Sequence, residues 1–155
     1  MMDYATRVIA IDWSRYESAA GPVLAAYEVP GHLIELAHTK PERASHAARR
    51  LNESLCHQGV FIDSAALPAL PFLLEALRST TDTSVAWSLL HLLEGFADCS
   101  RSIPGPNRDW PNREWVITLR QELVLHRSAI ASWTRHEDEN VRTEAQAVLS
   151  SLDMD

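Results

Sequence analysis

"LCHQGVFIDSAALPALPFLLEALRS", residues 55–79, decides the fold class of this chain. One amphipathic pattern ends in this stretch at Gly59, because glycine favours the left-handed backbone at a helix C-terminus. A second pattern begins a few residues later, where Asp63 or Ser64 can cap a new helix. Its apolar stripe is Leu67, Leu70, Leu74 and Leu77. Pro71 falls inside this helix, and its missing N–H predicts a kink. Two amphipathic helices set so close together favour an α-helical repeat.

The rest of the chain carries further helical patterns. Pro30 suits the first position of a helix that runs to Ala37, and Pro41 suits the start of the next, which ends at Gly59. Residues 79–84, "STTDTS", supply caps for a helix striped by Val85, Leu89, Leu92, Leu93 and Phe96. A long pattern covers residues 115–133, and a last helix covers residues 141–152. The only strand-like run, "VFI" at residues 60–62, is too short to build a sheet, so we predict an all-α chain.

Apolar positions recur along the chain at fixed offsets. Six pairs differ by 41 residues: Leu33 and Leu74, Leu36 and Leu77, Ala44 and Val85, Ala48 and Leu89, Leu51 and Leu92, Leu55 and Phe96. From the second unit to the third the offset is 56, as between Leu89 and Ala145. Repeats of helix pairs in HEAT and armadillo arrays have periods of about 40–47 residues. Chance periodicity among short amphipathic helices is the alternative.

These offsets predict an α-solenoid of about three HEAT-like helix pairs in a single domain, residues 1–155. Residues 1–29 form an N-terminal cap segment, and the repeats cover residues 30–58, 63–98 and 113–155. The Pro/Gly-rich residues 99–112 are an insertion between repeats two and three.

Two stretches resemble known repeat proteins. "HEDENVRTEAQAVLSSL", residues 136–152, resembles the second helix of HEAT repeats of the phycobilisome-lyase type through Asp138, Val141, Arg142, Ala145 and Leu149. Residues 12–37 and 55–77 resemble a small bacterial HEAT-like family in which a His-Gln-Gly turn precedes an Ala/Pro-rich helix. The arginine at position 142 has no counterpart at Ala86 or Ser45, so an arginine ladder is missing. The resemblance implies a HEAT-like fold and no settled activity.

Composition limits the function classes. The chain carries 14 Lys and Arg against 21 Asp and Glu, a net charge of −7, which disfavours nucleic acid as a partner. Two cysteines cannot make a disulfide framework, and Cys56 fits a small buried thiol. The N-terminus has no signal-peptide pattern, and no apolar run is long enough to cross a membrane. We therefore expect a cytoplasmic protein.

Residue types that carry chemistry are scattered. The seven histidines include no pair at i, i+4, and neither HExxH nor CxxC occurs, so we expect no metal site. No phosphate-binding glycine loop, nucleophile elbow or Cys/His arrangement can be recognised, so we expect no cofactor and no catalytic residue. A nonlocal constellation would escape this search.

A protein-binding scaffold or adaptor is therefore the favoured function, because stacked helix pairs present an extended surface. A sharper version is an acidic immunity-type inhibitor that covers the basic active site of a toxin. The alternative is an enzyme or chromophore-handling protein of the lyase-like HEAT type, and a DNA-binding HEAT fold is disfavoured by charge. The partner is another protein of unknown identity, and the oligomeric state stays open.

The binding site is predicted on the second helix of each pair, on the side away from the shared core. On a 3.6-residue period these positions are His46, Arg49 and Glu53, then Trp87, Leu90 and Glu94, then Thr143, Gln146 and Ser150. We expect Trp87 and Leu90 at the centre and Arg49, Glu53, Glu94 and Gln146 as a polar rim. The alternative is that the N-terminal segment around Trp13 and Tyr16, or the insertion, covers them. A second candidate is Trp110 in the insertion, for which packing onto the protein's own helices is the alternative.

Overall fold

The computed structural model describes residues 2–18, 22–57, 61–101 and 114–154, and in them the chain is all-α with little strand. In them it forms eight α-helices, two short 3-10 helices and one pair of two-residue strands. The elements are α1 (Tyr4–Ile9), η1 (Trp13–Arg15), α2 (Pro22–Leu36), α3 (Pro41–Leu55), β1 (Cys56–His57), β2 (Phe61–Ile62), α4 (Ala66–Ser79), α5 (Thr83–Cys99), α6 (Glu114–Leu125), α7 (Arg127–Ala131), η2 (Ser132–Arg135) and α8 (Glu139–Asp153). The all-α prediction is confirmed.

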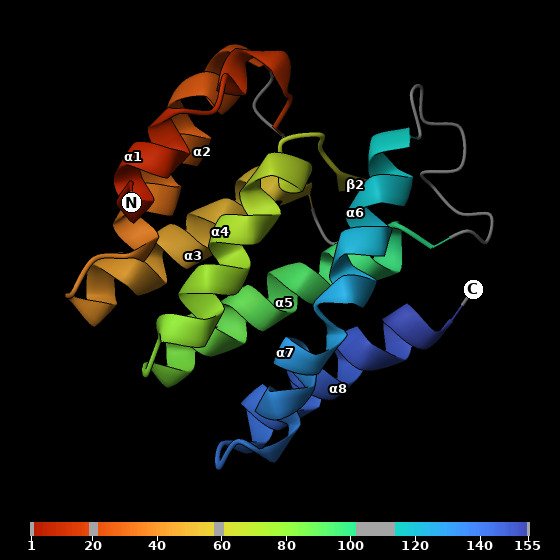
Figure 1. Ribbon diagram of the computed structural model, residues 1–155. Helices are drawn as coiled ribbons and strands as arrows, with labels where there is room; N and C mark the ends of the chain where they lie inside the picture. Colours follow the sequence, from red (N-terminus) through yellow and green to blue (C-terminus); the bar gives the residue numbers. More distant parts are fainter. Residues whose placement is uncertain (1, 19–21, 58–60, 102–113, 155) are drawn as a thin grey trace.

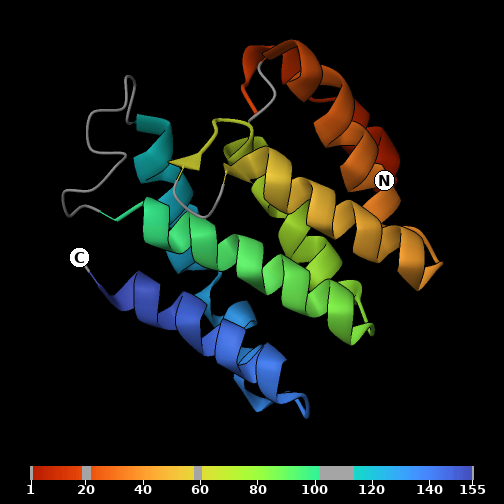
Figure 2. The ribbon, with the colours of Figure 1, turned by 180° about the vertical axis from the view of Figure 1, so that it is seen from behind.

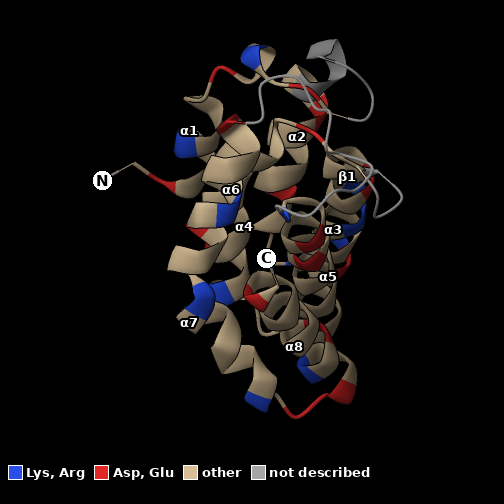
Figure 3. Cartoon of the chain, turned by 90° about the vertical axis from the view of Figure 1, so that its right-hand side faces the viewer, with Lys and Arg blue, Asp and Glu red and all other residues tan. Residues whose placement is uncertain are grey.

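The helices lie in two layers. Seen edge-on in Figure 3, α4, α6 and α7 lie on one side and α3, α5 and α8 on the other. Figure 1 is viewed from the side of α4 and α6. Seen from behind in Figure 2, α3, α5 and α8 lie side by side and run in the same direction. Helix α5 packs against both α3 and α8 and is therefore the central helix of its layer.

Local sequence signals set several helix starts. Pro41 lies in the first turn of α3, where its missing N–H costs nothing, as predicted. The Asp82 carboxylate accepts a hydrogen bond from the Val85 N–H at 3.0 Å and so caps α5 within the predicted "STTDTS" stretch. Asp138 caps α8 in the same way, with 3.0 Å to the Val141 N–H.

Three predicted boundaries are wrong. Helix α2 begins at Pro22 and continues through Pro30, which removes a single backbone hydrogen bond without ending the helix. Helix α3 ends at Leu55, before Gly59, because Cys56 adopts an extended backbone and pairs with Ile62. The long pattern over residues 115–133 breaks at His126 into α6 and the shorter α7 and η2.

The start of α4 also differs from the prediction. Its N-cap position is Ala65, which has no side chain to accept a hydrogen bond. The Ser64 hydroxyl instead accepts a hydrogen bond from the Glu17 N–H at 2.9 Å, and the Ala65 N–H donates to the Glu17 carbonyl at 3.0 Å. These two bonds attach the segment after η1 to the beginning of α4. Pro71 does lie inside α4, as predicted.

The core fills the space between the two layers. All twelve positions of the six pairs related by 41 residues are buried, including Leu33 and Leu74. From the third predicted unit Val141, Ala145, Val148, Leu149 and Leu152 are buried as well. Leu67, Trp115 and Trp133 are only half-buried and pack against the edge of this core. The apolar periodicity therefore identified the core better than it identified the helix ends.

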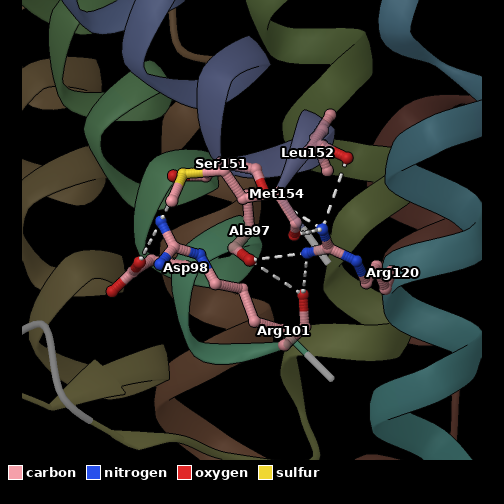
Figure 4. A network of polar contacts seen from close by, with 8 residues as sticks. Ala97, Asp98, Arg101, Arg120, Ser151, Leu152 and Met154 are labelled. Carbon is pink, nitrogen blue, oxygen red and sulfur yellow. Dashed lines mark hydrogen bonds and ion pairs between the residues drawn. The ribbon is translucent and has the colours of Figure 1, made fainter. Parts of the chain in front are cut away.

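Arg120 of α6 joins the C-terminal ends of two helices of the other layer (Figure 4). One terminal nitrogen of its guanidinium donates to the Ala97 carbonyl of α5 at 2.9 Å. The other terminal nitrogen donates to the carbonyls of Ser151 and Met154 at 2.9 and 2.8 Å. The last carbonyls of a helix lack intrahelical partners and carry the negative end of the helix dipole, so a cation at this place stabilises both helices.

Candidate protein-binding face

The predicted binding positions lie on one surface, the side of α3, α5 and α8 that faces away from the core. We call this surface the outer face; it is turned toward the viewer in Figure 2. Eight of the nine predicted positions lie at the surface of the molecule, and all of these are exposed except the half-buried Glu94. They are His46, Arg49, Glu53, Trp87, Glu94, Thr143, Gln146 and Ser150. The structure thus brings side chains from three segments of the sequence onto one surface.

Leu90 is the exception, and its predicted exposure is wrong. Its side chain is 0% exposed and belongs to the core. The physical reason is the position of α5 between α3 and α8, because a central helix is covered on both flanks as well as on its core side. Only a narrow arc of α5 reaches solvent. Apart from the first turn, this arc carries Trp87, His91, Glu94 and Asp98.

Trp87 is the large apolar side chain on this arc, and it is 38% exposed. Its indole ring stacks on the imidazole of His91, with ring centroids 5.0 Å apart and 7° between the planes. His91 Nδ1 lies 3.0 Å from Glu144 Oε1 of α8. The tryptophan is therefore held in place through a histidine by a neighbouring helix.

Acidic side chains lie on one side of the stacked Trp87 and His91. Burial raises the pKa of the Glu94 carboxyl, and the negative charges of Asp98 and Glu144 raise it further. Helix α5 contains two acidic residues and no lysine or arginine; the charge of His91 lowers the pKa of Glu94, and Arg101 just after the helix pairs with Asp98 at 3.0 Å. A positive group placed beside Glu94 would therefore gain electrostatic energy.

The opposite edge of the outer face, on α3, has a different charge. Arg49 and Arg50 are exposed there, and Arg50 forms an ion pair with Glu53 at 2.8 Å. Hydrogen bonds hold this edge against α5, because Asn52 Nδ2 donates to the Ser88 carbonyl at 2.9 Å. The predicted rim residues thus share a surface with Trp87, with Arg49 and Glu53 exposed on α3 and Gln146 exposed on α8.

A shallow depression adjoins Trp87. Thr83, Ser84 and Trp87 of α5 line it together with Asp138 and Asn140 at the beginning of α8, and its volume is about 560 Å³. Ser84 Oγ lies 3.0 Å from Ser45 Oγ of α3, which fixes the rim of the depression. Trp87 therefore borders a small concavity that a partner side chain can enter.

Sequence reasoning missed two members of this site, His91 and Glu144. A residue four positions after Trp87 lies on the same side of a helix, so the i, i+4 relationship could have selected His91 in place of Leu90. Nothing local in the sequence relates His91 to Glu144, because that contact depends on how α5 and α8 pack. Trp110, the second predicted anchor, lies outside the described residues.

No three His, Cys, Asp or Glu side chains gather as metal ligands in residues 2–18, 22–57, 61–101 and 114–154. Over the same described part of the chain, no helix combines the length and apolar character needed to span a bilayer. Cys56 is buried, as predicted, and Cys99 is half-buried.

Comparison with protein-family models, with curated proteins and with solved structures gave no match. The resemblance to HEAT-like repeats stays a prediction.

Proposed function

We propose that this protein is a non-catalytic binding module that docks another protein on its outer face, with Trp87 as the anchor. The observation that carries this proposal is the stack of the partly exposed Trp87 on His91, which Glu144 holds from the next helix. Tryptophan is enriched among the side chains that dominate binding energy. A ring already held in one orientation loses little conformational entropy on binding, so more of its contact energy appears as affinity.

We further propose a repeat architecture, which would suit such a binding face. This architecture consists of three HEAT-like helix pairs of an α-solenoid. The pairs are α2 with α3, α4 with α5, and α6 and α7 with α8. The burial of both members of every pair of positions related by 41 residues agrees with this arrangement. Repeats of this kind expose one face of each second helix and so present a continuous surface for a partner.

The charge of the outer face favours a basic partner. Burial raises the pKa of Glu94, and the charges of Asp98 and Glu144 raise it further, so a cationic side chain of the partner placed there would relieve their repulsion. An immunity-type inhibitor that covers the basic active site of a toxin, for example a nuclease, has this chemistry. The net charge of −7 would also speed its association with such a partner.

Site-specific photo-crosslinking in the native cell tests this proposal. A photoreactive residue at Thr143 or Gln146, both exposed on α8, is expected to capture one protein with a basic surface. The same residue at Arg78, exposed on α4 in the other layer, is the matched control and should not capture it. Capture of the partner only from position 78 would count against binding on the outer face. Turnover of a tetrapyrrole chromophore by the purified protein would instead favour the alternative of a chromophore-handling enzyme.

A further inference from the structure

The depression beside Trp87, about 560 Å³ in volume, has a polar lining that is largely without partners. Asp138 Oδ1 accepts a hydrogen bond from the Val141 N–H, which leaves Oδ2 without a partner in the described part of the chain. The Thr83 hydroxyl and the Asn140 side-chain amide likewise have no hydrogen-bond partner among the described residues. Each of these groups offers an oxygen that can accept a hydrogen bond. The lining therefore suits a ligand that brings several donors.

The indole ring of Trp87 has one face available to such a ligand. The imidazole of His91, one turn further along α5, covers the other face in a nearly parallel stack. Thr83 and Ser84 line the depression and lie about one turn before Trp87, whereas His91 does not line it. The depression therefore lies on the side of the indole away from the histidine, and a flat group that enters it can stack on the ring.

Charge selects a cation for this place. Asp138 is the one charged side chain among the described residues that line the depression. Arg142 lies one turn after Asp138 on α8, but its guanidinium donates to the carbonyls of His136 and Glu137 at 2.8 Å each. Glu137 and Glu139 add two further carboxylates beside Asp138 in the sequence. This end of α8 therefore carries an excess of negative charge.

The helix dipoles do not reverse this preference. The depression lies at the N-terminal ends of α5 and α8, and the positive end of a helix dipole, about half a unit charge, attracts anions. Asp82 caps α5 and Asp138 caps α8, so a full carboxylate charge already meets each of these ends. A further anion would meet these carboxylates, whereas a cation can pair with the second oxygen of Asp138.

We propose that this depression receives an arginine side chain of the protein partner, with its guanidinium stacked on Trp87 and its N–H groups donating to Asp138. This inference rests on the proposed function, because it names the group that the outer face recognises. A guanidinium is planar and weakly hydrated, so it can lie parallel to the indole and gain cation–π attraction. Its forked donors can reach the Asp138 carboxylate and a neighbouring hydroxyl or amide oxygen together. A lysine ammonium has the charge but neither the plane nor the fork.

Peptide titration followed by NMR tests the proposal without the natural partner. The probe is a blocked tripeptide with a central arginine, and the signal is the Trp87 indole N–H, assigned from its loss in Trp87→Phe. We expect this signal to move at roughly 10 mM peptide, because one exposed contact contributes little affinity. A lysine tripeptide should bind several-fold more weakly, and a citrulline tripeptide, whose side chain is a neutral urea, should leave the signal in place. An unmoved signal with arginine, or equal binding of lysine or citrulline, would overturn the proposal.

The variant Asp138→Asn removes the charge but keeps the helix cap, because asparagine caps helices as well as aspartate does. It should keep its helical content and bind the arginine tripeptide about threefold or more weakly. Asp3→Asn is the matched control: Asp3 caps α1 through the Thr6 N–H at 2.9 Å and does not line the depression, so this variant should bind like the wild type. Binding that Asp138→Asn leaves unchanged, or that Asp3→Asn weakens equally, would contradict an arginine at Asp138.

The partner captured on the outer face separates this inference from the proposed function. If Trp87→Ala weakens the binding of that partner and Asp138→Asn does not, the outer face is the docking surface but no arginine occupies the depression. If nothing is captured from Thr143 or Gln146 while the arginine tripeptide still binds at Trp87 and Asp138, docking on the outer face fails and the guanidinium site stands.

Discussion

The ring of Trp87 lies nearly parallel to the imidazole of His91, one turn further along α5, with 5.0 Å between their centroids. The contact from His91 to Glu144 extends this stack onto α8. The exposed aromatic of the candidate site thus rests on a side chain that belongs to the packing of two helices. Its orientation depends on the distance between α5 and α8, and any change in their packing should alter binding.

Leu90 should contribute to stability rather than to binding. Because its side chain is fully buried, Leu90→Ala is expected to lower the free energy of unfolding by about 2–5 kcal/mol. Gln146→Ala, on the same face but exposed, should change it by less than about 0.5 kcal/mol. Chemical denaturation followed by circular dichroism measures both values. Equal and small effects at the two positions would show that Leu90 is not in the core.

Gly95 allows α5 to approach β1. A Cβ atom at Gly95 would lie 2.5 Å from Cys56 Sγ but 3.6 Å from Cys56 Cβ, so only the sulfur prevents a larger residue. Gly95→Ala should therefore destabilise the fold by about 1–3 kcal/mol. In a Cys56→Ala background the same change should be neutral or stabilising, because alanine favours helix by about 1 kcal/mol over glycine. A double-mutant cycle with no coupling between the positions would contradict this account.

Arg120 should stabilise the ends of α5 and α8 together. Arg120→Ala leaves the carbonyls of Ala97, Ser151 and Met154 without this donor, and we expect a loss of about 1–3 kcal/mol. Arg120→Lys is the matched control; it keeps the charge but not the planar fork, so it should recover only part of the loss. Amide hydrogen exchange should quicken in the last turns of both helices. Slower or unchanged exchange there would show that Arg120 does not stabilise the two helix ends.

Glu94 should make the stability depend on pH. Its raised pKa means that, just above its ordinary value of 4.5, the folded chain holds a proton that the unfolded chain has released. The free energy of unfolding therefore falls as pH rises through this interval. Glu94→Gln should raise the melting temperature at neutral pH and remove this slope, whereas Glu137→Gln in an exposed loop should do neither. Melting temperatures measured from mildly acidic to neutral pH decide between these outcomes.

Much of the fold could be predicted because its signals are local. The starts of α3, α5 and α8 follow from Pro41, Asp82 and Asp138, whose effects act within one helical turn. The buried stripes follow from helical periodicity. Pro30 misled the prediction because a proline is compatible both with a first turn and with the interior of a helix that other contacts hold together.

The candidate site was only partly predictable because its details depend on neighbouring helices. Periodicity gives the side of α5 that faces the core, but not how far α3 and α8 cover its flanks, and this decided the burial of Leu90. The same limit applies to the contact between His91 and Glu144, whose positions are 53 residues apart. The close approach of Cys56 to Gly95 is likewise a tertiary contact without a local signal.

The affinity of Trp87→Ala for the partner captured on the outer face tests the central claim most directly. Isothermal titration of the purified pair should show a loss of about 2 kcal/mol or more, roughly 30-fold in Kd, with the helical content unchanged. Leu125→Ala removes an exposed apolar side chain from the opposite layer and should bind like the wild-type chain. If Trp87→Ala bound the partner as tightly as the wild type, the outer face around Trp87 would not be the docking surface.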